Sequence, residues 1–208
     1  MIVDLGRFVL SAACTQIAAW RQDWPDLVVA VNVSHQEILM PDFTHHVATV
    51  LREIGLPPEA LHLEVTETVL NAEESLALIL EPLATLGVAF SIDDFGTGYS
   101  SLSRLRGMKP TRLKIDRSFI AEIGEGDDEA APLLASIILM AHSIGHTVVA
   151  EGVETAQEAA FLTAHGCDEL QGYLISRPVA LGQVDLLLSA TGTPATNGGH
   201  YTPTGAFP

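Results

Sequence analysis

Acidic or amide residues end a series of short apolar runs, and this recurrence is the feature of the sequence that most directly suggests chemistry. Six runs share it, namely VVAVN, LHLEVTE, VAFSIDD, RLKID, TVVAE and ELQGY. The polar residues in them are Asn32, Glu64, Glu67, Asp93, Asp94, Lys114, Asp116, Glu151 and Gln171. Such runs are typical of buried parallel strands whose carboxyl ends meet at the active-site mouth of an α/β barrel. We therefore interpret these residues as one site.

Four carboxylates at one end of a sheet would repel one another, and this repulsion indicates a cation. The side chains concerned are Glu64, Asp93, Asp94 and Glu151. Hard divalent cations prefer oxygen ligands, and Asn32 adds an amide oxygen to the set. The adjacent pair Asp93 and Asp94 is suited to bridge two metals about 3.5–4 Å apart, the separation used for phosphoester hydrolysis.

Lys114 is expected to face the same site, because it alternates between Leu113 and Ile115 in an apolar strand. It would orient or activate the attacking water, or neutralise charge on a phosphate. It belongs to a cluster of six of the ten Lys and Arg residues. The other members are Arg104, Arg106, Lys109, Arg112 and Arg117. We interpret most of these as a solvated helix face.

A helix N-cap is the competing interpretation for each acidic residue at a strand end. Taken singly, we expect the cap to be the commoner role, by about three to one. One N-cap does not explain coincident carboxylates on four strands, so for the set as a whole we favour the site. On these grounds Glu67 and Glu154 remain open between the two roles.

The elements that would position these residues alternate between strand and helix. We predict strands at about 28–33, 61–66, 87–93, 111–115, 146–150 and 168–173. Helices are predicted near 42–54, 73–85, 100–106, 130–144 and 155–165, after an amphipathic helix over 4–22 with Phe8, Ala12, Ile17 and Trp20 on one stripe. This alternation predicts an α/β fold with a parallel sheet covered by helices.

Length and composition bound the remaining possibilities. The 208 residues, 48% of them apolar, predict one domain over 1–189, followed by a Gly-, Pro- and Thr-rich disordered tail over 190–208. A net charge of −16 argues against binding to long nucleic acid. We find no apolar run of the ~18 residues needed for a membrane span and no signal peptide, so we expect a cytoplasmic protein.

Several motifs resemble those of the EAL-domain cyclic-di-GMP phosphodiesterases, from about Leu5 to Leu188. These motifs are VNVS, LEVTE, SIDDFGTGYSSL, RLKIDRSFI, VVAEGVE and QGYLISRP. The resemblance implies a modified TIM barrel that uses two Mg2+ or Mn2+ ions to hydrolyse cyclic-di-GMP, a small cyclic dinucleotide, to linear pGpG. It also implies the following roles: metal ligands Asn32, Glu64, Asp93, Asp94 and Glu151; catalytic residues Lys114, Glu67, which anchors the DDFGTGYSSL loop, and Glu154; substrate-binding residues Gln171, Asp116 and Pro178.

One departure from the family pattern concerns the motif that names it. In the family, Glu-Ala-Leu lies on an early strand well before the Asn32 position and supplies a further metal ligand, and we expect this motif to be missing here. We therefore expect an incomplete barrel with about six of the eight strands. Its open edges, at 28–33 and 168–173, would pair with another chain, for example in a homodimer.

These expectations leave more than one function open. The first is a cyclic-di-GMP phosphodiesterase whose activity is impaired in the chain as it stands, because one metal ligand is lacking. The second is a catalytically inactive receptor for cyclic-di-GMP, or a protein-interaction module. A purely structural remnant of the family is a third reading.

Overall fold

The parallel sheet forms the centre of the molecule. A computed structural model of the chain describes residues 1–72, 76–96, 112–124 and 130–190. Within them six parallel strands follow one another in the order β1-β2-β3-β4-β5-β6. The strands are β1 (Val29–Asn32), β2 (Leu61–Thr66), β3 (Ala89–Phe95), β4 (Arg112–Ile115), β5 (Thr147–Ala150) and β6 (Glu169–Leu170). The predicted α/β fold with six parallel strands is confirmed, and β1 and β6 are its two edges.

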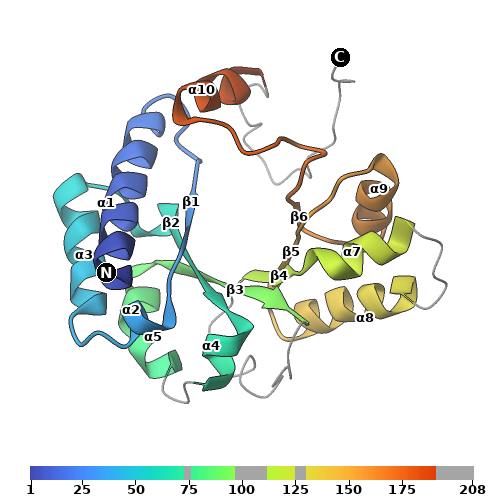
Figure 1. The fold of residues 1–208 in the computed structure, drawn as a ribbon, viewed down its shortest axis with the longest axis horizontal. Coiled ribbons are helices and arrows are strands. Elements are labelled where there is room, and N and C mark those ends of the chain that lie inside the picture. Colours follow the sequence, from blue (N-terminus) through green and yellow to red (C-terminus); the bar gives the residue numbers. More distant parts are fainter. Residues whose placement is uncertain (73–75, 97–111, 125–129, 191–208) are drawn as a thin grey trace.

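Helices cover the convex side of this curved sheet. They are α1 (Ile2–Trp20), α2 (His35–Ile38), α3 (Phe43–Ile54), α4 (Glu67–Ala72), α5 (Leu76–Leu86), α7 (Arg117–Gly124), α8 (Ala130–Ser143), α9 (Ala156–Ala164) and α10 (Leu181–Ala190), with a 3-10 turn, η1 (Pro58–Ala60). Figure 1 shows α1, α3 and α5 outside the first half of the sheet and α7, α8 and α9 outside the second. The helix α10 lies above the opening between β1 and β6, where Asp185 accepts a 2.6 Å hydrogen bond from the Trp20 indole.

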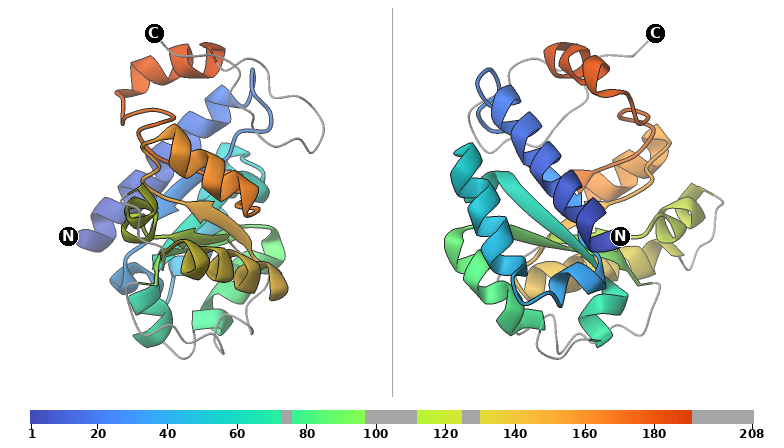
Figure 2. Two further views of the ribbon diagram at one scale, coloured as in Figure 1. Left: turned by 90° about the vertical axis from the view of Figure 1, so that its right-hand side faces the viewer. Right: turned by 60° about the vertical axis from the view of Figure 1, so that its left-hand side comes forward.

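The hydrophobic core lies between the sheet and this layer of helices. Alternate strand residues point outward into it, as Leu61, Leu63 and Val65 do on β2, and all three are buried. Leu113 and Ile115 do the same on β4. Because side chains alternate along a strand, the residues between them face the concave side. The two side views in Figure 2 show the helices wrapped around one face of the sheet.

Several predicted details of the first helix are wrong. Its buried stripe consists of Leu10, Cys14 and Ile17, whereas Phe8 and Ala12 are exposed. Ile17 belongs to both the predicted and the observed stripe, and α1 contacts α3 and β1. By length and composition alone α1 is also a candidate membrane span, contrary to our reading of the sequence. In this structure its buried residues pack on the core.

Four of the helices in the described residues, each directly after a strand or loop, were not predicted from the sequence. These are α2, α4, α7 and α10, of four to ten residues each. Short helices carry little apolar periodicity, which explains why the pattern did not predict them. The predicted helix at 100–106 and almost all of the predicted tail at 190–208 lie outside the described residues.

The tripeptide Glu-Ala-Leu is present after all, at Glu59-Ala60-Leu61, and this corrects our expectation that the chain lacks it. It forms η1 and the first residue of β2. Ala60 and Leu61 are fully buried there. Because Glu59 precedes β2, it lies at the amino end of that strand, while Glu64 lies toward the carboxyl end. The tripeptide is therefore not placed to supply a ligand at the mouth.

Two loops at the carboxyl ends of β5 and β6 are locked together through their backbones. Val153 donates its N–H to the Gln171 carbonyl at 3.0 Å, and Leu174 donates to the Val153 carbonyl at 3.0 Å. Gly172 makes this contact feasible, because a Cβ at that position would lie 2.2 Å from the Val153 oxygen. The same contact ends β6 after Leu170, earlier than the predicted 173. The loop that begins with Glu151 is held in place by this neighbour.

We predict that Gly172→Ala destabilises the fold by about 1–3 kcal/mol, since an added methyl group overpacks against backbone that cannot swing aside. The matched control is Gly182→Ala in α10, where nothing lies within 4 Å of the added Cβ. There alanine should stabilise by up to about 1 kcal/mol through its higher helix propensity. Urea unfolding of the two variants measures both effects. Equal stabilities would contradict the assigned role of Gly172.

Candidate active site

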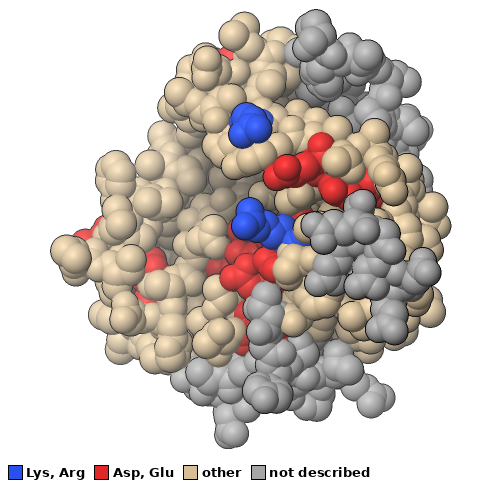
Figure 3. Space-filling view, turned by 45° about the vertical axis from the view of Figure 1, so that its right-hand side comes forward, with Lys and Arg blue, Asp and Glu red and all other residues tan. Residues whose placement is uncertain are grey.

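The concave face of the sheet carries polar side chains where barrels of this kind usually hold branched apolar residues. On β2 the residues between the core positions are His62 and Glu64, and on β4 they are Arg112 and Lys114. Ser91 and Asp93 occupy the equivalent positions on β3. Figure 3 shows acidic side chains gathered in a hollow of the surface, with basic side chains beside them. The mouth at the carboxyl ends is therefore charged and mostly acidic.

Lys114 lies at the centre of this charged group. Its ammonium group lies 3.0 Å from Glu64 Oε2, 2.9 Å from Asp93 Oδ1 and 2.6 Å from Glu151 Oε1. The three carboxylates come from β2, β3 and the residue that directly follows β5. Only 5% of the Lys114 side chain is exposed, so these contacts are shielded from solvent. The structure thus brings together Glu64, Asp93, Lys114 and Glu151, as the sequence predicted.

Asp93 and Asp94 point into the same site although they are adjacent on one strand. In a regular strand neighbouring side chains face opposite sides of the sheet. Here the pairing of β3 with β4 shifts between Ile92 and Phe95, and Asp94 adopts a left-handed conformation with φ of 55°. Aspartate tolerates this conformation better than most residues. As a result, ligand oxygens of Asp93, Asp94 and Glu151 lie within 4.8 Å of one another.

The protonation of these groups reflects their crowding. Burial raises the pKa of Asp94, and the carboxylates of Asp93 and Asp116 raise it further. Burial likewise raises the pKa of Glu151, and the neighbouring Lys114 offsets this only in part. For Lys114, burial disfavours the ammonium form, but the hydrogen bonds to its carboxylate partners prevail and hold its pKa above the usual range. Lys114 is therefore charged at neutral pH.

The helices that follow β1, β4 and β5 are capped by residues of different kinds. Ser34 caps α2, and Thr155 caps α9, each through a capping box. Asn32 and Glu151 therefore do not cap the helices that follow their strands. Asp116 does act as a cap, because its Oδ1 accepts a 3.0 Å hydrogen bond from the Ser118 N–H in the first turn of α7. Burial alone would raise the pKa of Asp116, but the hydrogen bonds from Ser118 outweigh it and lower that pKa.

The remaining predicted residues lie around this group. Asn32 ends β1 beside Glu64, its partner in the strand register, and is exposed. Glu67 is buried at the start of α4, and its Oε2 accepts a 3.0 Å hydrogen bond from the Gly96 N–H. Glu154, Gln171 and Pro178 are exposed in the loops after β5 and β6.

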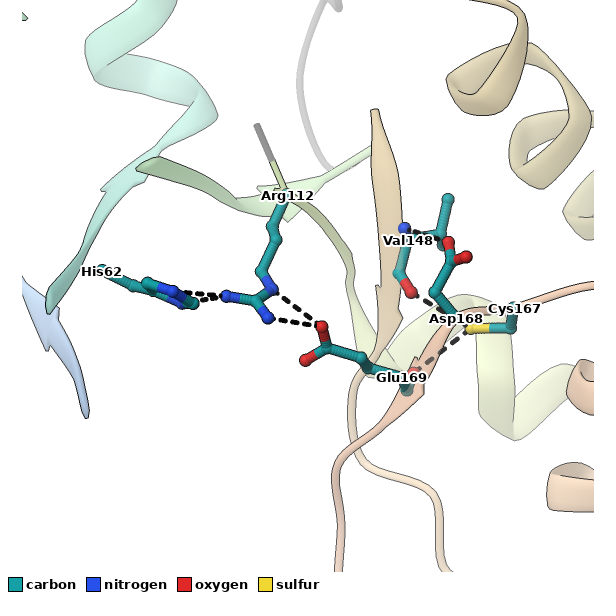
Figure 4. Close-up of polar contacts among 6 residues, drawn as sticks. All are labelled: His62, Arg112, Val148, Cys167, Asp168 and Glu169. Carbon is teal, nitrogen blue, oxygen red and sulfur yellow. Dashed lines mark hydrogen bonds and ion pairs between the residues drawn. The ribbon is translucent and has the colours of Figure 1, made fainter. Parts of the chain in front are cut away.

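Arg112 lies within the strand predicted at 111–115, although most of its basic cluster was interpreted as a solvated helix face. It is the first residue of β4 and lies two positions before Lys114 on the same side. Figure 4 shows its guanidinium between His62 and Glu169. Arg112 Nη2 lies 2.6 Å from Glu169 Oε1, and Arg112 Nη1 lies 2.8 Å from His62 Nε2. Burial, together with Arg112, lowers the pKa of His62 to about 4, so this imidazole is neutral at pH 7.

His62, Arg112 and Glu169 form a second polar layer beneath the carboxylate group. Its two residues on β2 and β4 could have been found from the sequence. In RLKID the basic residues Arg112 and Lys114 are separated by Leu113, the period of a strand. The same period links His62 to Glu64 in LHLEVTE. Arg117 is exposed at the start of α7, while Arg104, Arg106 and Lys109 lie outside the described part of the chain.

The donor set fits divalent cations. It consists of carboxylate oxygens, which are the ligands preferred by hard ions such as Mg2+ and Mn2+. Asp93, Asp94 and Glu151 are close enough for one ion to contact all three. Glu64 lies next to this set, because Lys114 contacts Glu64 as well as Asp93 and Glu151. A curved parallel α/β sheet with such an acidic group at its carboxyl ends places the protein among the TIM-like barrels.

Comparison with known proteins identifies the particular barrel. The model of the EAL domain family matches residues 1–178, and the chain belongs to this family. One relative is MucR of Pseudomonas aeruginosa, a bifunctional diguanylate cyclase/cyclic di-GMP phosphodiesterase. It is 40% identical over 189 residues, which are 88% of this chain and 27% of the relative. The chain spans about a quarter of the length of the curated relatives it matches.

Solved structures of the family have the same fold. The PaMucR phosphodiesterase in complex with c-di-GMP has a TM-score of 0.83 at 39% identity, covering 88% of this chain and 74% of that one. The EAL domain of Mycobacterium smegmatis DcpA has a TM-score of 0.85 at 39% identity, covering 91% and 86%. The manganese/cy-diGMP complex of Klebsiella pneumoniae BlrP1 has a TM-score of 0.71 at 31% identity, covering 83% and 45%.

The cap assignment of Asp116 is testable by substitution. We predict that Asp116→Ala lowers the free energy of unfolding by about 1 kcal/mol, because the first turn of α7 loses its acceptor. Asp116→Asn should be nearly neutral, since asparagine and aspartate cap about equally well. Urea unfolding at pH 7 compares the two. An equal loss in both variants would show that the charge of Asp116, rather than its capping oxygen, matters to the fold.

Proposed function

We propose that this chain is the catalytic domain of a divalent-metal-dependent phosphodiesterase that hydrolyses cyclic-di-GMP to linear pGpG. The observation that supports this most directly is the convergence of Glu64, Asp93, Asp94 and Glu151 on one mouth of the barrel. Membership of the EAL family supports the assignment of these carboxylates to a phosphodiesterase site. The c-di-GMP complexes of MucR and BlrP1 supply the substrate class, and the second of these contains manganese.

Each residue then has a definite task. Glu64, Asp93, Asp94 and Glu151 would hold the cations, with Asn32 as a further oxygen donor at the edge of the mouth. The bound ions supply Lewis acidity and a hydroxide nucleophile at neutral pH. Lys114 is charged and lies among the same carboxylates, where it neutralises charge on the phosphate or orients the attacking water. Glu67 anchors Gly96, the residue that follows the ligand strand β3.

A non-catalytic cyclic-di-GMP receptor is the second candidate. Two observations favour it: Glu59-Ala60-Leu61 lies away from the mouth, and Asn32 is exposed on an edge strand. The full set of carboxylates around Lys114 favours the enzyme, because a receptor would not need to keep four mutually repelling groups together. We place either activity in bacterial second-messenger signalling in the cytoplasm.

The activity itself is tested by hydrolysis of cyclic-di-GMP with Mg2+ or Mn2+. We expect turnover that depends on the added cation, because the carboxylates at the mouth would hold the ion that supplies the nucleophile. Chromatography of pGpG measures the rate with each cation. Binding of cyclic-di-GMP without turnover would favour the receptor.

The bridging role of Asp93 and Asp94 is tested by Asp93→Asn and Asp94→Asn. Each substitution should lower the rate by about 100-fold or more, because it removes charge shared with the cations. Folding should survive, since asparagine is nearly isosteric and local repulsion falls. Asp42→Asn is the control, because Asp42 forms an exposed ion pair with Arg7. Wild-type turnover in both site variants would refute the metal assignment.

A further inference from the structure

We propose that Lys114 is a built-in counter-ion that holds the carboxylate group together without metal and competes with divalent cations for it. This inference rests on the proposed function, because it concerns the same site. It adds a second role to Lys114, namely that this residue lowers the affinity of the site for its metal. The role follows from the contacts of the ammonium group with the carboxylates.

The Lys114 ammonium contacts carboxylates that are themselves proposed metal ligands. It contacts one oxygen each of Glu64, Asp93 and Glu151, at 3.0, 2.9 and 2.6 Å. Asp93 and Glu151 also belong to the group of ligands that one ion could share. Asp93 Oδ1 is buried and makes no hydrogen bond of ordinary geometry among the described residues. Its ion pair with Lys114 therefore offsets the cost of burying this charged oxygen. The same oxygens cannot serve both cations fully.

Without Lys114 the carboxylates would be held against their own repulsion. They come from β2, β3 and the residue that follows β5, and the side chains of Glu64, Asp93 and Glu151 are 9%, 15% and 19% exposed. Repulsion between partly desolvated charges is stronger than in water. A single ammonium group in contact with all three offsets it and keeps the mouth assembled. When a divalent cation enters, it takes over this role and repels the ammonium.

The strand that carries Lys114 also offers a matched control. Arg112 lies two residues earlier on β4, faces the same side and is likewise ion-paired across the barrel, to Glu169 at 2.6 Å (Figure 4). Its partners are Glu169 and His62, which are not among the proposed ligands. Arg112→Met therefore removes a cation and an interstrand ion pair without freeing a ligand oxygen.

The experiment compares Mn2+ affinity and metal-free stability in the 208-residue protein and its Lys114→Met and Arg112→Met variants. Calorimetric titration at pH 8 gives the affinity, and thermal unfolding in EDTA gives the stability. An alkaline buffer keeps the competition from protons small. We expect Lys114→Met to bind Mn2+ about tenfold more tightly and to melt at a lower temperature in EDTA. Arg112→Met should change the affinity by less than about twofold while also lowering the melting temperature.

Each outcome decides the question. Equal or weaker Mn2+ binding in Lys114→Met would overturn the inference, because Lys114 would then support the metal or be indifferent to it. Equally tighter binding in Arg112→Met would overturn it too, since the effect would be one of general charge. If Lys114→Met does not fold, Lys114→Gln keeps hydrogen-bond donors without the charge and is judged by the same criterion. Failure of the wild type and both Lys114 variants to bind Mn2+ would instead reject the proposed metal site itself.

Discussion

The contact between one buried ammonium and three carboxylates is the interaction on which the site depends. Lys114 approaches the centre from β4, and its partners approach from β2, β3 and β5, so four neighbouring strands converge on one point. A curved parallel sheet makes this geometry available, because its strands all present their carboxyl ends on the same side. The ion pairs stabilise a concentration of negative charge that would otherwise drive the strand ends apart.

Unusual backbone conformations at Asp94 and Gly152 help to position the carboxylates around Lys114. Asp94 adopts a left-handed conformation where the register of β3 shifts, which brings two adjacent carboxylates into one site. Such irregularities are common beside active sites because they redirect a side chain. Gly152, with φ of 70°, follows Glu151 directly, and a Cβ there would lie 2.5 Å from Arg117 Cβ. Close packing of this loop against the start of α7 thus restricts the backbone beside Glu151.

The second polar layer places charged side chains in a barrel interior where apolar side chains are usual. His62, Arg112 and Glu169 come from β2, β4 and β6, and alternate strands supply the members of one layer in barrels of this type. The Glu169 side chain is 45% exposed, so the pair with Arg112 is only partly shielded from water and contributes modestly to stability. Its position beneath Lys114 places a second positive charge below the acidic mouth.

The sequence by itself determined the strands and the chemistry of their ends. Apolar runs that stop at Glu64, Asp93, Lys114 and Glu151 predicted both a parallel sheet and a shared mouth, because strand periodicity and residue type are local properties. It did not determine which acidic residue caps a helix, and Asp116 proved to be a cap. The exposed face of α1 was also predicted wrongly, because which side of that helix packs on the core depends on residues distant in the chain. Tertiary structure alone decided that Lys114 is shared by three carboxylates, because that contact requires four strands to curve toward one another.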